Sequence, residues 1–371
     1  MQNNIKLLWL SPNLNHYKAR FLDYLASGDG IKLTVISGSG RIGKGDKSLN
    51  KPRQFREIRL AASKSKFGIS REVRKTLKSN FNDFDWVLIP REKKNLLLIL
   101  YAAFLRIKAR SKGQNIRLVS YNHPMLRSSG GKSTLIDKAL TRIFYNIYDR
   151  IIFYSEASRN ECVTNGIISA NKAYWANNTI DTIEVDKHYT FSYPNPSNPT
   201  LLFIGRLIPS KKIDTCLEYY FSLKKELSKE EKILKLIIIG DGPESHFVKE
   251  AISKDSSIEW YGAIIDEAKI SKLMQRATFV FVPGLSGLSI NHAFSYGRPY
   301  ITFAGLKHGP EINYLKNNVN GLLLEPSLND NIIKLRALLI TTDKKLFNNA
   351  CSTGKELSIA NWKHQFTSSL N

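Results

Sequence analysis

Short runs of aliphatic and β-branched residues alternate along the chain with longer stretches in which apolar residues recur every third or fourth position. This alternation is typical of βα units that build a parallel sheet. We expect strands at 5–10, 31–37, 85–89, 116–120, 151–154, 173–175, 200–204, 235–239, 258–261, 278–282 and 300–303. We expect helices at 16–27, 70–80, 95–111, 132–148, 211–227, 244–253, 266–275, 288–296, 308–317 and 329–341. The pattern predicts an α/β protein with two Rossmann-like, doubly wound domains.

The predicted boundary between the domains is the proline-rich segment 193–199. Prolines donate no backbone hydrogen bond and do not continue a helix, so we expect a linker here. The predicted organisation is a first domain at 1–182, a linker at 183–199 and a second domain at 200–355.

Length and composition agree with two globular domains. The chain has 371 residues, of which 42% are hydrophobic and 23% charged. No apolar run approaches the roughly 20 residues of a membrane-spanning helix. The first apolar run, Ile5 to Leu10, is too short for a signal-peptide core and is expected to be a buried strand. Three widely spaced cysteines, Cys162, Cys216 and Cys351, suggest neither disulfides nor a metal site, and favour a reducing, cytoplasmic setting.

Charge is distributed unevenly. The net charge is +23, of which residues 1–180 carry +20 and the remainder +3. A basic first half favours an anionic partner, either nucleic acid or an anionic membrane surface. The alternative is a solvated lysine-rich surface without a specific partner.

Three motifs match well-known sites only in part. Residues 38–43 fit the dinucleotide pattern G-x-G-x-x-G, but loop-forming residues follow where a helix should begin. Residues 130–134 resemble the end of a P-loop, but Leu126 stands where its first glycine belongs. Asp83 and Asp85 form a carboxylate pair, yet they precede a strand, at the end of the sheet opposite to the one where ligands bind.

The second half contains a more coherent set of residues. The predicted strand 200–204 ends in Gly205, and Arg206 and Lys211 follow. Two cations at the carboxyl end of a parallel strand lie where a bound diphosphate needs positive charge. The alternative is that both cations are merely solvated.

Two further glycine turns follow strands in the same half. The first is Gly240-Asp241-Gly242-Pro243-Glu244. The second, Gly284-Leu285-Ser286-Gly287, leads into a predicted helix that ends before Gly297-Arg298-Pro299. The amides of Leu288, Ser289 and Ile290 would open this helix and point at an anion.

In this order and spacing the chain resembles the retaining glycosyltransferases of family 4, which have the GT-B fold. The first half adds His123 after the strand 116–120, the segment 149–155, and Asn177-Asn178-Thr179-Ile180-Asp181, which is similar to the family's Asn-Gly-Ile-Asp turn. The resemblance therefore covers most of the chain.

The resemblance implies two domains facing a central cleft, with a nucleotide-sugar in the second and an acceptor bound mainly by the first. It also implies a terminal helix at about 356–371, containing Trp362, that returns to the first domain. No metal or other cofactor is expected, because cations and helix amides take its place. The implied catalytic residues are Arg206, Lys211 and His123. The implied donor-binding residues are Gly205, Gly240, Gly287, Leu288, Ser289, Ile290, His292 and Glu311, and Asn13 and His16 lie on the acceptor side.

The chain departs from the family at two glutamates, separated by seven residues, that normally touch the donor sugar and the ribose. Gly284 stands at the first position and His292 at the second. A neutral imidazole still hydrogen-bonds a ribose hydroxyl, but a histidine on a helix can equally be structural.

The leading hypothesis is a metal-independent glycosyltransferase acting with retention on a glycan or polyprenyl-linked acceptor in cell-surface polysaccharide biosynthesis. It would work in the cytoplasm or on the inner face of the plasma membrane. The segment 95–112 would then either lie against anionic headgroups or form a buried helix with a basic end. The alternatives are a catalytically silent binding or scaffold subunit and a sugar-nucleotide epimerase; a nucleic-acid binder is disfavoured because no known binding module is present.

Overall fold

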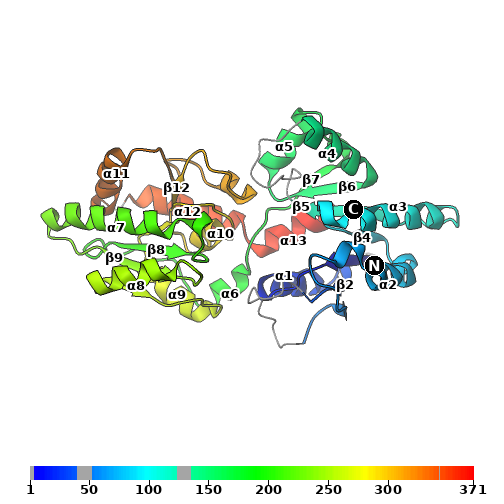
Figure 1. Ribbon diagram of the computed structural model, residues 1–371, viewed down its shortest axis with the longest axis horizontal. Helices are drawn as coiled ribbons and strands as arrows, with labels where there is room; N and C mark the ends of the chain where they lie inside the picture. The colour runs from blue at the N-terminus through cyan, green and yellow to red at the C-terminus, as the bar shows by residue number, and fades with distance from the viewer. Residues whose placement is uncertain (1–3, 40–51, 123–134, 342) are drawn as a thin grey trace. The chain divides into compact units, whose positions relative to one another are not determined.

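The computed structural model describes residues 4–39, 52–122, 135–341 and 343–371, which form two compact units (Figure 1). The first unit comprises Met1–Asn178 and Ile359–Asn371, and the second comprises Thr179–Ser358. The chain therefore passes between the units twice, after Asn178 and after Ser358. The proline-rich segment 193–199 lies within the second unit.

The first unit is built on a seven-stranded parallel sheet. Its order is β3 (Arg56–Arg59), β2 (Ile31–Ser37), β1 (Ile5–Ser11), β4 (Trp86–Leu88), β5 (Arg117–Asn122), β6 (Arg150–Phe153) and β7 (Ala173–Trp175). Successive side chains of β1 point to opposite faces, so Leu7 and Trp9 enter one core and Leu8 and Leu10 enter another. Both faces of the sheet are therefore buried, as is usual for parallel sheets.

Helices cover both faces of this sheet. On the Trp9 face pack α1 (His16–Ala26) and α13 (Ile359–Ser368), and Trp362 and Phe366 of α13 lie against Trp9 and Phe21. On the Leu8 face pack α2 (Arg71–Asn80), α3 (Leu96–Arg110), α4 (Leu135–Ile147) and α5 (Glu156–Thr164). Short 3-10 helices are η1 (Phe67–Ile69), η2 (Phe81–Asp83), η3 (Lys93–Asn95) and η4 (Ala170–Lys172).

The second unit contains a six-stranded parallel sheet. Its order is β10 (Ile258–Trp260), β9 (Lys235–Ile239), β8 (Thr200–Ile204), β11 (Phe279–Phe281), β12 (Tyr300–Phe303) and β13 (Gly321–Leu324). Its helices are α6 (Thr182–Asp186), α7 (Ile213–Leu227), α8 (Ser245–Lys254), α9 (Glu267–Arg276), α10 (Leu288–Ser295), α11 (Leu328–Thr341) and α12 (Lys344–Glu356), with 3-10 helices η5 (Pro209–Lys211), η6 (Ser228–Glu230) and η7 (Pro310–Tyr314).

The predicted fold class is confirmed: each unit is a doubly wound, Rossmann-like α/β sandwich. In each sheet the winding direction reverses once, between β1 and β4 in the first unit and between β8 and β11 in the second. Ligands of such sheets bind outside the carboxyl ends of the strands at this reversal. The topology therefore identifies the loops after β8 and β11 as the place to look for a site in the second unit.

The helix expected at 308–317 is wrong in type and length. Only the five residues Pro310–Tyr314 are helical, and they form a 3-10 helix. Pro310 opens it in the first turn, where a missing amide does no harm, and Leu315 at its end is extended.

Candidate functional site

Two glycines bring the carboxyl ends of β8 and β9 into close backbone contact. The Gly205 amide donates to the Ile239 carbonyl at 2.9 Å, and Gly240 has a φ of 146°. A Cβ on Gly240 would overlap the Gly205 carbonyl oxygen. Glycine is therefore required here by space and by backbone conformation, which explains this part of the motif without a ligand.

Lys211 is held at the switch point by a main-chain acceptor. Its ammonium group donates to the carbonyl of Leu285, which lies in the loop after β11. Burial lowers the pKa of Lys211, and the nearby charge of Arg206 lowers it further, whereas the charge of Glu311 raises it. The structure thus gathers Arg206, Lys211 and Glu311 at the carboxyl edge of the second sheet.

Arg206 and Lys211 differ in their surroundings. Arg206 is exposed, whereas the side chain of Lys211 lies along Gly205 and is mostly covered. A fixed, partly desolvated ammonium next to an exposed, planar guanidinium suits an anion with several oxygen atoms, because Lys supplies a point charge and Arg a fork of donors.

The loop after β11 is tied to η5 by its main chain. The Gly284 amide donates to the Lys211 carbonyl at 3.2 Å, and the Leu285 amide donates to the Ser210 carbonyl at 2.7 Å. A Cβ on Gly284 would overlap the Ser210 carbonyl oxygen. A side chain at position 284 is therefore incompatible with this backbone, so the first glutamate of the family that the sequence resembles would have no room here.

Sequence reasoning missed His308, which supports the same loop. The Ser286 amide donates to His308 Nδ1 at 3.0 Å, so this nitrogen is the acceptor, and Nε2 then donates to the Phe303 carbonyl at 2.8 Å. Burial is the main cause that lowers the pKa of His308, and this favours the neutral ring. No motif marks the residue, because its role depends on the adjacency of β12 and the loop after β11.

Helix α10 begins at the glycine-rich loop, with Gly287 as its N-cap. The Ile290 amide, which we expected to face an anion, donates to the Gly287 carbonyl at 3.0 Å. The Leu288 and Ser289 amides have no backbone acceptor within the described part of the chain. The Ser289 hydroxyl forms a hydrogen bond with that of Tyr300 at 2.8 Å. Two first-turn amides, rather than three, remain for a ligand.

His292 lies inside the second unit with a side chain that is only 5% exposed. Its Nε2 is 3.9 Å from Oε1 of Glu267 on α9, and the same carboxylate accepts a hydrogen bond from the Tyr296 hydroxyl at 2.7 Å. Burial lowers the pKa of His292, and the negative charge of Glu267 partly opposes this shift. The ring therefore has a structural environment of its own, and its contact with a ribose stays a prediction.

The acceptor-side residues lie at the carboxyl end of β1 in the first unit. The Asn13 carbonyl accepts a hydrogen bond from the Ser11 hydroxyl at 3.0 Å, and His16 is the first residue of α1. His123 lies outside the described residues. The structure adds Lys18, a half-buried residue whose Nζ is 5.7 Å from the centre of the Trp9 ring. Burial lowers the pKa of Lys18 to about 8.

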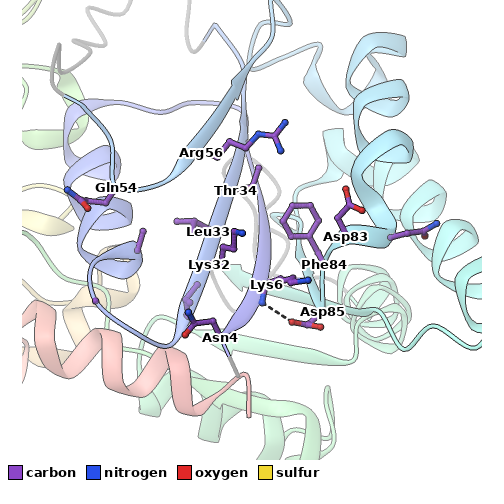
Figure 2. Close-up of a pocket in the computed structure, with 14 residues that line it drawn as sticks. Asn4, Lys6, Lys32, Leu33, Thr34, Gln54, Arg56, Asp83, Phe84 and Asp85 are labelled. Carbon is purple, nitrogen blue, oxygen red and sulfur yellow. Dashed lines mark hydrogen bonds between the residues drawn. The ribbon is translucent and has the colours of Figure 1, made fainter. Parts of the chain in front are cut away.

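A separate polar pocket of about 770 Å³ lies at the amino end of the first sheet (Figure 2). Lys6, Lys32, Arg56, Asp83 and Asp85 are among its lining residues. Figure 2 shows the Asp85 carboxylate turned toward the Lys6 amide, which donates to it at 2.8 Å. Asp85 thus binds a main-chain amide at the amino end of the central strands, opposite to the switch-point loops.

Comparisons with known proteins agree with this architecture. Residues 198–339 match the family model described as glycosyl transferases group 1. Among solved structures, Anabaena Alr3699/HepE in complex with UDP shares 16% identity, with 99% of each chain covered and a TM-score of 0.70. Sucrose-phosphate synthase from Thermosynechococcus elongatus shares 14% identity, with 98% of each chain covered and a TM-score of 0.68. The pneumococcal O-GlcNAc transferase GtfA in complex with UDP and GlcNAc shares 18% identity over 80% of this chain and 59% of that one, with a TM-score of 0.58.

A search of curated proteins found no match. The solved structures are below 25% identity and establish the fold, whereas the family match covers most of the second unit. The chain has the GT-B fold, and residues 198–339 of its second unit match the family model of glycosyl transferases group 1.

Proposed function

We propose that this chain transfers a sugar from a nucleoside-diphosphate donor, bound by the second unit, to an acceptor bound mainly by the first. The observation that carries the proposal is the position of Lys211, whose ammonium is fixed by the Leu285 carbonyl beside Arg206 at the β8–β11 switch point. UDP is the first nucleotide to test, because the Anabaena and pneumococcal neighbours were solved with it.

The proposed roles follow from charge and position. Arg206 and Lys211 neutralise the diphosphate, and the amides of Leu288 and Ser289 add donors at the positive end of α10. These groups supply the countercharge that a metal ion would otherwise provide, so we propose binding without metal. Gly205 and Gly240 allow the ends of β8 and β9 to lie close together beside the proposed donor site, and His292 is proposed to contact the ribose.

We propose retention of the anomeric configuration, as in glycosyltransferase family 4. In that mechanism the acceptor hydroxyl attacks the sugar from the face that the diphosphate leaves, and an oxygen of the departing diphosphate takes the hydroxyl proton. No side-chain base is needed, so a glycine at position 284 is compatible with activity. An inverted product would instead direct attention to His123 as a base.

The proposed acceptor is a glycan or a polyprenyl-linked sugar in cell-surface polysaccharide biosynthesis, used at the cytoplasmic side of the membrane. The support is the basic first half, with +20 in residues 1–180. No helix in the described part of the chain is long and apolar enough to cross a membrane. Asn13, His16 and Lys18, at the carboxyl end of β1, are the proposed acceptor-side residues.

Calorimetry with UDP, GDP, CDP and dTDP in the presence of EDTA tests the donor site. We expect one nucleotide to bind without metal, and Arg206→Ala to weaken that binding while the melting temperature is unchanged. Failure of all four nucleotides to bind a folded protein would refute the proposal.

A catalytically silent subunit is the second candidate, favoured by Gly284 and by the burial of His292. Such a protein would bind the nucleotide and its sugar conjugate but never cleave the conjugate, so slow donor hydrolysis separates the two functions.

A further inference from the structure

The exposed large apolar side chains of the first unit come from elements that contact one another. Among the described residues they come only from η1, α3 and α4. They are Ile69, Leu96, Leu97, Leu100, Phe104, Ile107, Leu140 and Ile143. Scattered exposed apolar residues are normal on soluble proteins, but a contiguous group marks a contact surface.

Helix α3 provides the centre of this surface. Leu97, Leu100, Phe104 and Ile107, which we call the apolar stripe, are spaced by three and four residues and therefore share one side of the helix. Phe104 is 59% exposed and Ile107 is 65% exposed. The opposite side of α3 enters the core of the unit, so the stripe is additional to the apolar residues that the fold requires.

Helix α4 extends the surface. Helices α3 and α4 contact each other and bury residues in the same core. The Arg142 side chain of α4 donates to the Gly166 carbonyl after α5, at 3.0 Å through Nε. Phe144 and Tyr145 of α4 enter the core, whereas Leu140 and Ile143 are 40% and 60% exposed. Two helices that contact each other thus both present exposed apolar side chains.

Exposed cations lie on α3 and α4 themselves and on α2, which contacts α3. Helix α3 has no acidic residue, and exposed lysines and arginines stand on α2, at the end of α3 and on α4. They are Arg71, Lys75, Lys78, Lys108, Lys112 and Lys138. Of the nearby acidic groups, Asp149 binds Arg106 and Arg110, Glu92 binds Lys94, and Glu72 of α2 is exposed. The exposed cations therefore outnumber the exposed carboxylates on these elements.

We propose that this surface of η1, α2, α3 and α4 docks on an anionic lipid bilayer. The apolar stripe enters the boundary between headgroups and acyl chains, and the surrounding cations meet lipid phosphates. The charge favours a bilayer over a second copy of the chain, because two copies would bring like-charged rims together. The proposal goes beyond the sugar-transfer function and does not depend on the donor site.

Sedimentation with vesicles of phosphatidylcholine alone and with added phosphatidylglycerol tests the proposal. We expect binding that increases with phosphatidylglycerol and is lost by about 0.5 M salt, because attraction between charges fades with screening. The double variant Phe104→Ser with Ile107→Ser should bind at least about tenfold more weakly, because apolar insertion and charge act together. The matched control is Phe221→Ser with Ile333→Ser, which changes two exposed apolar residues of the second unit and should bind as the wild type does.

The cationic part is tested by Lys108→Ser with Lys112→Ser. Arg106 and Arg110 are left in place because they bind Asp149, so replacing them would change an ion pair of the first unit together with the surface charge. UDP binding and the melting temperature, measured on every variant, show that the protein is folded and that the donor site is unchanged. Equal binding to both kinds of vesicle, or none to either, would overturn the proposal. So would a concentration-dependent dimer in sedimentation velocity that Phe104→Ser with Ile107→Ser abolishes, because the surface would then be an interface between two copies.

Discussion

Gly284 lies so close to the main chain of Ser210 and Lys211 that a larger residue would push the loop after β11 away from η5. We expect Gly284→Ala to cost about 1 to 3 kcal/mol of unfolding free energy, the usual range for overpacking a close contact. Displacement of Lys211 should also weaken UDP binding. Gly287→Ala is the control, because nothing lies within 4 Å of a Cβ placed there. Equal stability of the two variants in chemical denaturation would contradict this account.

Lys211 and Arg206 are expected to act on the diphosphate without contributing much to the fold. Lys211→Met keeps an aliphatic chain beside Gly205 and removes the charge together with the hydrogen bond to the Leu285 carbonyl. We expect turnover of the donor to fall by the equivalent of about 2 to 4 kcal/mol, the scale for losing one preorganised transition-state contact. Lys225→Met, an exposed lysine on α7, is the matched control. Similar turnover by the two variants would show that Lys211 does not act on the diphosphate.

The buried histidines should make the protein less stable in mildly acidic solution. Burial lowers the pKa of His292 and of His308 from the ordinary value of 6.5. Below that pH the unfolded chain binds protons that the folded chain does not, so stability falls as pH decreases. We expect His292→Gln to show a smaller loss of melting temperature than wild type between about pH 7 and pH 5.5, the range in which His titrates. If the melting temperature of His292→Gln falls with pH as steeply as that of the wild type, protonation of His292 is not the cause of the acid sensitivity.

At this scale the sequence predicted residues but not their contacts. The spacing of Gly205, Arg206 and Lys211 after a strand was enough to propose a diphosphate site. The sequence could not show that Lys211 donates to the Leu285 carbonyl, because the two residues are 74 positions apart and their segments meet only through the pairing of β8 with β11. The interior position of His292, beside Glu267 of α9, depends on packing between helices in the same way.

At the scale of elements, α3 and β6 are joined by a compact ion pair. The Arg106 side chain is 13% exposed and donates to the Asp149 carboxylate at 2.6 Å. Asp149 also accepts from the Leu118 amide at 2.8 Å.

Asp149→Ala should therefore be costly, because it leaves the Leu118 amide and the Arg106 guanidinium without their shared acceptor. We expect a loss of about 1 to 3 kcal/mol of unfolding free energy, the range for an unsatisfied buried polar group. Arg110→Ala is the control, since Arg110 is 49% exposed and an exposed ion pair contributes about 1 kcal/mol or less. If urea denaturation gives the two variants the same stability, the pair does not join α3 to β6 as described.

Strong periodicity was sufficient to predict most elements, including every strand expected from the pattern. Strand β3 was missed because its sequence, Arg-Glu-Ile-Arg, has one apolar residue, and pairing with β2 at the sheet edge decides its conformation. Strand β13 was missed because Gly321 begins a short run with no alternation, and its pairing with β12 comes from the tertiary fold. Local propensity does not show which strand a short segment pairs with, so neither β3 nor β13 could be predicted from its own residues.

At the scale of the whole molecule, the two sheets share one winding order around their switch points, yet the units differ in chemistry. The second unit carries the cations and helix amides proposed for the donor, while the first carries the excess positive charge and the apolar stripe. The charge difference was visible in the sequence. The stripe was not, because the apolar residues of 95–112 divide between core and surface only once α3 packs on the sheet.

Hydrolysis of nucleotide-sugars in EDTA tests the central claim, sugar transfer from a nucleoside-diphosphate donor, most directly. A panel of UDP-, GDP-, CDP- and dTDP-sugars is incubated with wild type and with Lys211→Met, and both the released nucleotide and the first anomer of the freed sugar are followed by NMR. The account predicts slow release from one donor class with the anomeric configuration retained, and a rate lower by at least about 30-fold in Lys211→Met, in line with losing one transition-state contact. Binding of a nucleotide with no cleavage of any conjugate, or equal cleavage by both proteins, would contradict it.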